Sequence, residues 1–586
     1  MPNIDPKTVL IEASWEVAHK DGGIYTVLTT KLEHARAHFP GTQYIPVGAY
    51  RTPIQDFLES DVPEEWRGIA TNLEKLGVAF HYGTWQVPGK PVAILLGWDG
   101  LLPQLNTMKG TLWTDFKLDT LDAGPDTDEP LLWSAAVGHF VAEYAAAHPG
   151  TPIVLHAHEW LTTGAILIAK QRKAPVKTVF TTHATILGRS LCSNNEFIYD
   201  KLDSFKPEEE AKKYRIVSKW QLEKLGANEA DVFTTVSEVT AKEATAFLGR
   251  KPIVVENGID GALFPTYDEI VNQRPEIREK LDDFISAYFF PSYRFNLADT
   301  RYLFTMGRYE YKNKGYDIEL EGLGKLNEEL KAEKSNQTIV AFFFVPGDSL
   351  RLRPDVTHQL VTYQHLNGIL KDFSTSEARR VEREIWDDVE CSCSLMPESA
   401  RDHARRLLDG VRTDKDPLVS PFDLRHPEED AIIKGAAAFG LNNTKEDRVK
   451  VLFFPVYLDG FDGAFNLPLY DLVSGCDLGL FTSLYEPWGY TPVESVALGV
   501  PAITSTLAGF GQAIKETKGA FVLDRDNDKH EEELAELVRL MRLPLTESKR
   551  QWVARRLAAY QIVDAFDWAE LYPKYLAAYQ TAQASD

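Results

Sequence analysis

The chain has 586 residues, enough for two or three domains, and 44% hydrophobic and 25% charged residues, as in globular proteins. Its net charge of −23 argues against nucleic acid or an anionic membrane surface as the main partner. No apolar run is long enough to cross a membrane, and the first residues do not resemble a signal peptide. The four cysteines are expected to be free thiols in a reducing cytoplasm; they are Cys192, Cys391, Cys393 and Cys476.

A strand is predicted over residues 8–13, followed by Lys20, Gly22 and Gly23 and then by a helix. A strand, paired glycines and a helix let the backbone approach a ligand at a helix N-terminus. Paired glycines alone more often mark only a tight turn. An anionic ligand of this acidic protein would need basic residues such as Lys20 nearby.

The next informative strand, residues 152–155, ends in His156, His158 and Glu159. A metal site is not predicted, because strand alternation places only residues i and i+2 on one face and no third ligand is evident nearby. Polar groups at the carboxyl end of a parallel strand fit a ligand site better. The following strand, residues 176–181, leads to His183 and Arg189, which can bind a hydroxyl and an anion respectively.

Strands continue to alternate with helices up to the Asn257-Gly258 turn, which predicts a Rossmann-like first domain ending near residue 265. A second sheet begins at residues 302–306. Its first loop holds three cations, among them Arg308 and Lys314, between two glycines. Such a loop can grip a diphosphate, although taken alone it could equally be a solvated basic loop.

Residues 350–447 interrupt the α/β alternation with charged residues at helical spacing, which predicts an inserted helical subdomain. The sheet resumes near residue 449. A buried strand at residues 478–481 then precedes a break at Glu486 and a helix carrying Glu494. The amides of residues 489–491 begin that helix and form an anion site. Two solvated glutamates are the ordinary alternative, but carboxylates for sugar hydroxyls beside amides for phosphate suit a nucleotide-sugar enzyme.

Three blocks, residues 485–492, 181–189 and 307–315, resemble the animal and fungal type of glycogen synthase, glycosyltransferase family 3. The resemblance implies the α/β GT-B fold, two Rossmann-like domains that face a cleft. It implies an acceptor-side domain at residues 1–265 and a nucleotide-sugar domain at 266–548. Within the second domain, residues 350–447 would mediate oligomerisation into a dimer or tetramer, and residues 549–586 would cross back to the first domain.

The implied reaction transfers glucose from UDP-glucose to the non-reducing 4-hydroxyl of glycogen or another α-1,4-glucan, with retention of configuration. No cofactor and no metal are implied. The residues with implied catalytic roles are Glu486, His183, Arg189, Arg308 and Lys314. Those with implied substrate-binding roles are Lys20, Gly22, Gly23, His156, Glu159, Asn257, Trp488, Gly489, Tyr490, Thr491 and Glu494.

The sequence departs from the family pattern at two positions outside these lists. Asp21 replaces the usual valine and puts a negative charge near the phosphate site. Leu469, with Tyr470 beside it, stands where the family has a tyrosine that stacks on uracil. ADP-glucose as donor or a different acceptor therefore stays open, and so does a non-catalytic glucan-binding protein.

The C-terminal segment lacks most of the arginines with which the regulated eukaryotic enzymes bind glucose 6-phosphate. Arg550, Arg555 and Arg556 are followed by Leu557 to Gln561, where further arginines would stand. Little or no activation by glucose 6-phosphate is therefore expected, and no control through phosphorylated tails.

Overall fold

The structure, a computed structural model, describes residues 4–585 except 122, 387–396, 515–516 and 526–528. The largest sheet has nine strands in the order β3-β4-β5-β2-β1-β6-β7-β8-β9 and is parallel from β5 to β9, with β3 and β4 antiparallel at one edge. Its strands are β1 (Val9–Ala13), β2 (Tyr44–Ala49), β3 (Phe57–Glu59), β4 (Ala79–Trp85), β5 (Val92–Gly97), β6 (Ile153–His158), β7 (Lys177–Thr182), β8 (Val232–Thr235) and β9 (Ile253–Val254).

A second sheet of six parallel strands follows in the order β14-β11-β10-β15-β16-β17. Its strands are β10 (Thr300–Met306), β11 (Thr338–Phe344), β14 (Val449–Phe454), β15 (Leu478–Leu480), β16 (Ala502–Ser505) and β17 (Ala520–Leu523). Every residue of β10, β11 and β14 except Arg301 is buried, as expected for parallel strands covered by helices on both faces.

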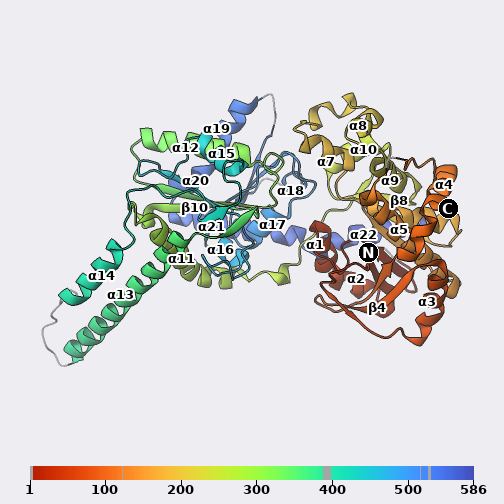
Figure 1. Cartoon of the computed structure of the whole chain (residues 1–586), viewed down its shortest axis with the longest axis horizontal. Helices are drawn as coiled ribbons and strands as arrows, with labels where there is room; N and C mark the ends of the chain where they lie inside the picture. The colour runs from red at the N-terminus through yellow and green to blue at the C-terminus, as the bar shows by residue number, and fades with distance from the viewer. Residues whose placement is uncertain (1–3, 122, 387–396, 515–516, 526–528, 586) are drawn as a thin grey trace.

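Helices cover both faces of the first sheet. Those of the first 265 residues are α1 (Gly23–Thr30), α2 (Leu32–His38), α3 (Glu64–Leu76), α4 (Leu105–Phe116), α5 (Pro125–Ala147), α6 (Thr163–Gln171), α7 (Ile186–Ser193), α8 (Pro207–Lys213), α9 (Val217–Glu229) and α10 (Glu238–Leu248). Figure 1 shows the two sheets in separate lobes joined at a narrow waist, near which α1 and α17 lie.

The second lobe contains most of the remaining helices. They are α11 (Tyr267–Phe289), α12 (Tyr316–Ala332), α15 (Ala431–Ala438), α16 (Leu469–Gly475), α17 (Tyr490–Ala497), α18 (Gly509–Ala513), α19 (His530–Met541), α20 (Leu543–Thr546) and α21 (Lys549–Tyr560). The chain then returns, and α22 (Trp568–Ala584) packs against β7, β8 and α2 of the first lobe. There the Trp568 indole donates to Thr30 Oγ1 at 2.8 Å, and Tyr575 and Tyr579 are buried.

The insertion consists of β12 (Ser349–Leu352), α13 (Pro354–Trp386), α14 (Glu398–Asp409) and β13 (Phe422–Leu424), with β12 and β13 paired antiparallel. Figure 1 shows α13 and α14 side by side, projecting away from the second lobe. Whereas α15 packs on α12 in the second lobe, residues 349–424 form the part that corresponds to the helical subdomain expected at residues 350–447. Its role in oligomerisation remains a proposal.

Asp477, just before β15, ties α11 to the second sheet. Its carboxylate accepts from Arg274 and Arg278, both at 2.8 Å, and from the Tyr302 amide at 2.9 Å. Burial opposes its ionisation, but Arg278 and Arg274 outweigh burial and lower the pKa of Asp477 to about 2.

Two of the expected free thiols, Cys192 and Cys476, are unpaired and buried. Cys391 and Cys393 lie outside the described residues. Among the described helices, none combines the length and the apolar character needed to cross a membrane.

Candidate active site

The site lies where loops that follow strands of the two sheets approach each other, as expected for ligand sites of open α/β sheets. The second lobe contributes the loops after β10 and β15. Lys314, from the first loop, forms an ion pair with Glu486, from the second; their side chains are 13% and 18% exposed. The sequence places them 172 residues apart. The structure therefore brings together two of the five expected catalytic residues.

Gly315 makes this pairing possible. Its φ of 82° is unfavourable for other residues, and a Cβ there would lie 2.3 Å from the carbonyl oxygen of Thr482. Only glycine lets the loop after β10 approach the strand end before Glu486 so closely. Gly315, the second glycine that flanks the basic loop, is thus required for packing.

The two expected catalytic arginines are solvent-exposed. The Arg308 side chain is 63% exposed and lies 3.1 Å from Glu310. Arg189, in α7 of the first lobe, is also exposed and lies within electrostatic reach of Glu159 and Glu486. Both guanidinium groups are therefore able to turn onto an anion that enters between the lobes.

Glu494, in α17, hydrogen-bonds Tyr470 and lies within the electrostatic reach of Lys20 and Lys314. Tyr470 is 40% exposed and packs on Phe264 with ring centroids 5.6 Å apart. Leu469 is only partly buried and packs against the core. The aromatic ring beside Glu494 thus belongs to Tyr470, one residue after Leu469, where the family has its tyrosine.

In the first lobe, Glu159 holds the loop that carries His183. Its backbone has a φ of 68°, and its carboxylate accepts from the amides of His183 at 2.9 Å and Ala184 at 3.2 Å. Burial raises the pKa of Glu159 to about 7 against the opposing influence of Arg189 and these amides. Glu159 thus orients its neighbours from a buried position, only 8% exposed.

Three predicted substrate-binding side chains do not face open space. His156 is 1% exposed and contacts Tyr579 and Thr181 in the core. Asn257 is 4% exposed and meets Tyr575 of α22. Trp488 is 3% exposed and packs on Phe566. The return of the C-terminal segment covers all three side chains, and their contact with substrate remains a prediction.

In the loop before α1, some backbone amides are already hydrogen-bonded within the protein. Glu16 accepts from the amides of Gly22 at 2.9 Å and Tyr25 at 2.8 Å. Burial raises the pKa of Glu16 despite these hydrogen bonds. Gly23 remains open, since a Cβ there would meet no atom within 4 Å. A ligand was expected to approach the backbone at both glycines, but only Gly23 has open space beside it.

Arg51 was not found from the sequence. It forms an ion pair with Asp21 and lies over the Trp15 ring at 5.1 Å. The negative charge that Asp21 adds beside Lys20 is therefore neutralised within the same lobe. Arg51 lies 30 residues from Asp21 in the sequence, and no sequence pattern indicates that the two meet.

The Arg51–Asp21 ion pair can be tested through the binding of the donor. Arg51→Ala should raise KM for an anionic donor several-fold, because Asp21 would then repel it, with kcat little changed. Asp21→Ala with Arg51→Ala should restore KM in steady-state assays. Equal KM values for Arg51→Ala and the double variant would contradict this role of Asp21.

Three buried side chains of the first lobe form a cluster of possible metal ligands. Glu12, His156 and His158 present ligand atoms within 4.8 Å of one another. However, the ammonium group of Lys31 bonds the same Glu12 oxygen that faces both histidines. A cation would have to displace that ammonium, so the group does not fit a metal ion.

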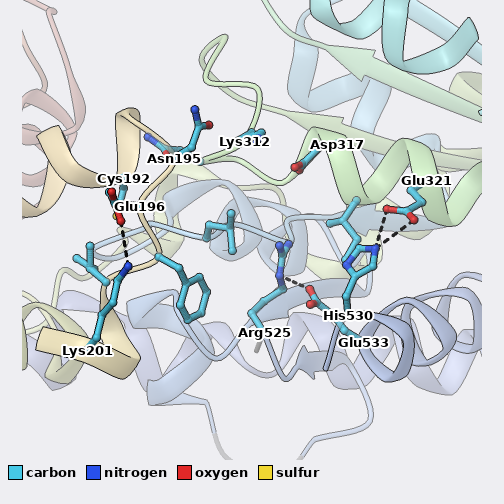
Figure 2. A pocket seen from close by; sticks show the side chains of 15 residues that line it. Cys192, Asn195, Glu196, Lys201, Lys312, Asp317, Glu321, Arg525, His530 and Glu533 are labelled. Carbon is cyan, nitrogen blue, oxygen red and sulfur yellow. Dashed lines mark hydrogen bonds and ion pairs between the residues drawn. The ribbon is translucent and has the colours of Figure 1, made fainter. Parts of the chain in front are cut away.

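A separate cavity of about 360 Å³ lies between the lobes. Figure 2 shows Cys192, Asn195 and Lys201 of the first lobe facing Lys312 and Asp317 of the second. Most of its charged groups are paired: Glu196 with Lys201, Arg525 with Glu533, and Glu321 with His530. Tyr485 also joins the lobes by donating to Glu243 at 3.0 Å.

The sequence model of the family "Glycogen synthase" matches residues 12–585. The chain belongs to the glycogen synthase family. A glycogen [starch] synthase of Neurospora crassa is 32% identical, over 99% of this chain and 85% of that protein. The human liver glycogen [starch] synthase is 30% identical, over 96% and 82%. The resemblance inferred from three motifs is confirmed, and the alternatives outside glycogen synthesis are not favoured.

Solved structures confirm the GT-B fold of this glycogen synthase family member. The catalytic domain of starch synthase IV from Arabidopsis thaliana superposes with a TM-score of 0.51 at 13% identity, over 98% of this chain and 99% of that one. A UDP-forming trehalose-phosphate synthase from Burkholderia vietnamiensis also gives 0.51, at 12% identity, over 99% and 98%.

Proposed function

We propose that the enzyme transfers glucose from UDP-glucose to the non-reducing 4-hydroxyl of an α-1,4-glucan with retention of configuration. The observation that carries the proposal is the Lys314–Glu486 ion pair, which sets a cation for phosphate against a carboxylate for sugar hydroxyls. His183 and the exposed Arg189 are supplied by the opposite lobe. We place the enzyme in the cytoplasm, as a dimer or tetramer.

Departure of UDP from an oxocarbenium-like centre would be the chemical step. Lys314, Arg308 and Arg189 would stabilise the leaving diphosphate electrostatically. The amides of residues 489–491 would assist, because the first turn of α17 has no intrahelical acceptor for them. Glu486 would contact the sugar hydroxyls, and Glu494, beside Tyr470, would contact the ribose.

Closure of the two lobes on the donor would exclude water that otherwise hydrolyses it. The Lys314–Glu486 ion pair would open when the donor binds. An arriving diphosphate would take over Lys314 and leave the Glu486 carboxylate to accept from the sugar. A same-face mechanism of this kind requires no covalent nucleophile.

The test is glucose incorporation into glycogen from UDP-glucose and from ADP-glucose, with wild type and Arg308→Ala. We expect UDP-glucose-dependent incorporation that falls about 10²–10³-fold in the variant, the loss typical of one removed transition-state donor. Preference for ADP-glucose would refute the donor assignment. Binding of glucan without incorporation from either donor would refute the enzymatic proposal.

Glucose 6-phosphate is expected to change the rate by less than about twofold. Arg555 bonds Glu547 and the Lys518 carbonyl, and buried Arg556 bonds the carbonyls of Cys476 and Ser474. Of the three arginines, only Arg550 is fully exposed. Rates measured with and without millimolar glucose 6-phosphate check this prediction, and a several-fold rise would contradict it.

A further inference from the structure

A chain of buried hydrogen bonds runs from the core of the first lobe to His183. Glu12, near the end of β1, bonds His158 Nε2 at 2.8 Å, and His158 Nδ1 bonds His183 Nε2 at 2.9 Å. Glu12 is 0% exposed, His158 1% and His183 8%. Exposure rises along this relay, defined as Glu12, His158 and His183, so that His183 is its most exposed member.

The relay has one consistent proton arrangement while Glu12 is ionised. A carboxylate can only accept, so His158 must carry its proton on Nε2. Neutral His158 then offers a lone pair at Nδ1, and His183 must carry its proton on Nε2 to bond it. The remaining nitrogen of His183, Nδ1, is therefore an acceptor. Within the described part of the chain, no group bonds His183 Nδ1.

The surroundings keep Glu12 ionised and both histidines neutral. Lys31 bonds Glu12 Oε1, and Tyr44 donates to Oε2 at 2.5 Å. Burial raises the pKa of Glu12, but Lys31, His156 and His158 outweigh it, so that the pKa lies well below its usual value. Burial lowers the pKa of His158 well below its usual value and that of His183 to about 3.

We propose that Glu12 and His158 are positioning residues that fix His183 in the tautomer with an accepting Nδ1, so that His183 selects a donor sugar with a hydroxyl that donates to it. This inference rests on the proposed glucosyl transfer. A free histidine can present either a donor or an acceptor to a hydroxyl, which both donates and accepts. The relay removes that choice and fixes the direction of the hydrogen bond.

The direct test is neutron diffraction from deuterium-exchanged crystals of the unmodified protein. We expect deuterium on Nε2 of both His158 and His183 and none on Nδ1 of His183. Deuterium on His183 Nδ1 would overturn the proposal. This readout does not depend on any assay of transfer.

The functional test uses UDP-glucose analogues with fluorine in place of the 3-, 4- or 6-hydroxyl, because fluorine cannot donate. Wild type should discriminate against one analogue at least about tenfold in kcat/KM, which corresponds to one hydrogen bond. His158→Phe should reduce that discrimination several-fold. His158→Gln, whose amide can donate to Glu12 and accept from His183, should keep more of it.

His139→Phe in α5 is the control, a partly buried histidine whose ring lies 3.4 Å from Arg172. It should leave the discrimination unchanged. A His158 variant that lowers kcat with the discrimination intact would show a merely structural role and overturn the proposal. If no nucleotide sugar supports transfer, the proposed function fails, whereas the neutron result still decides the tautomer.

Discussion

Lys314→Ala is expected to lower the rate of glucosyl transfer about 10²–10³-fold, with a smaller change in KM for the donor. Lys314 is the cation that contacts Glu486. In the proposed mechanism, the variant removes it from the point where negative charge develops on the leaving phosphate. It also leaves the Glu486 carboxylate without its partner. Steady-state assays of glucose incorporation into glycogen measure both parameters.

Lys312→Ala is the matched control, because Lys312 belongs to the same loop but is exposed and lines the separate cavity instead. It should retain transfer within about twofold, in line with the small energies of exposed charges. A comparable loss in both variants would show that only the net charge of the loop matters. The assigned role of Lys314 would then be wrong.

Asp477→Asn is expected to destabilise the second lobe by about 3–5 kcal/mol, because it leaves Arg274 and Arg278 without their buried counter-charge. The carboxylate side chain is 6% exposed. Hydrogen exchange resolved to β10 and β15 measures the effect locally, which matters in a chain of two lobes. Asp423→Asn, at an exposed pair with Arg351, should cost less than about 1 kcal/mol.

The same residue predicts a loss of stability in acid. The pKa of Asp477 is about 2 in the folded protein against 3.8 as its ordinary value. A depressed pKa contributes stability that is fully present above the ordinary value and is lost as the pH falls from about 4 through 2. The depressed pKa contributes about 2 kcal/mol to the free energy of unfolding. In Asp477→Asn, this part of the fall in stability between pH 4 and 2 should be absent.

Most of the fold was predictable because each sheet is made of buried parallel strands with apolar sequences. Residues 478–481 and 302–306 were assigned correctly for that reason. The pairing of Glu486 with Lys314 could be expected only from the family resemblance. Nothing local in either loop shows that they meet.

The burial of three predicted binding residues has one physical origin. His156, Asn257 and Trp488 lie at the ends of elements that a ligand could reach, but the return of the C-terminal segment covers them. By contrast, Glu12 did carry a signal, a charged residue inside the apolar strand Val9–Ala13. A buried charge demands partners, so Glu12 predicts a polar network, although it does not name Lys31 or His158 as its members.

The return of α22 to the first lobe determines when that lobe can finish folding during synthesis. Trp568 reaches Thr30, and Tyr579 reaches His156, so the first lobe is completed by a segment far downstream of it in the chain. While the ribosome adds the intervening 300 residues or so, the face later covered by α22 is exposed to solvent, as is usual for incomplete domains. The first lobe must therefore wait until α22 has been synthesised, and release of the chain before that point would leave the apolar face to chaperones or to aggregation.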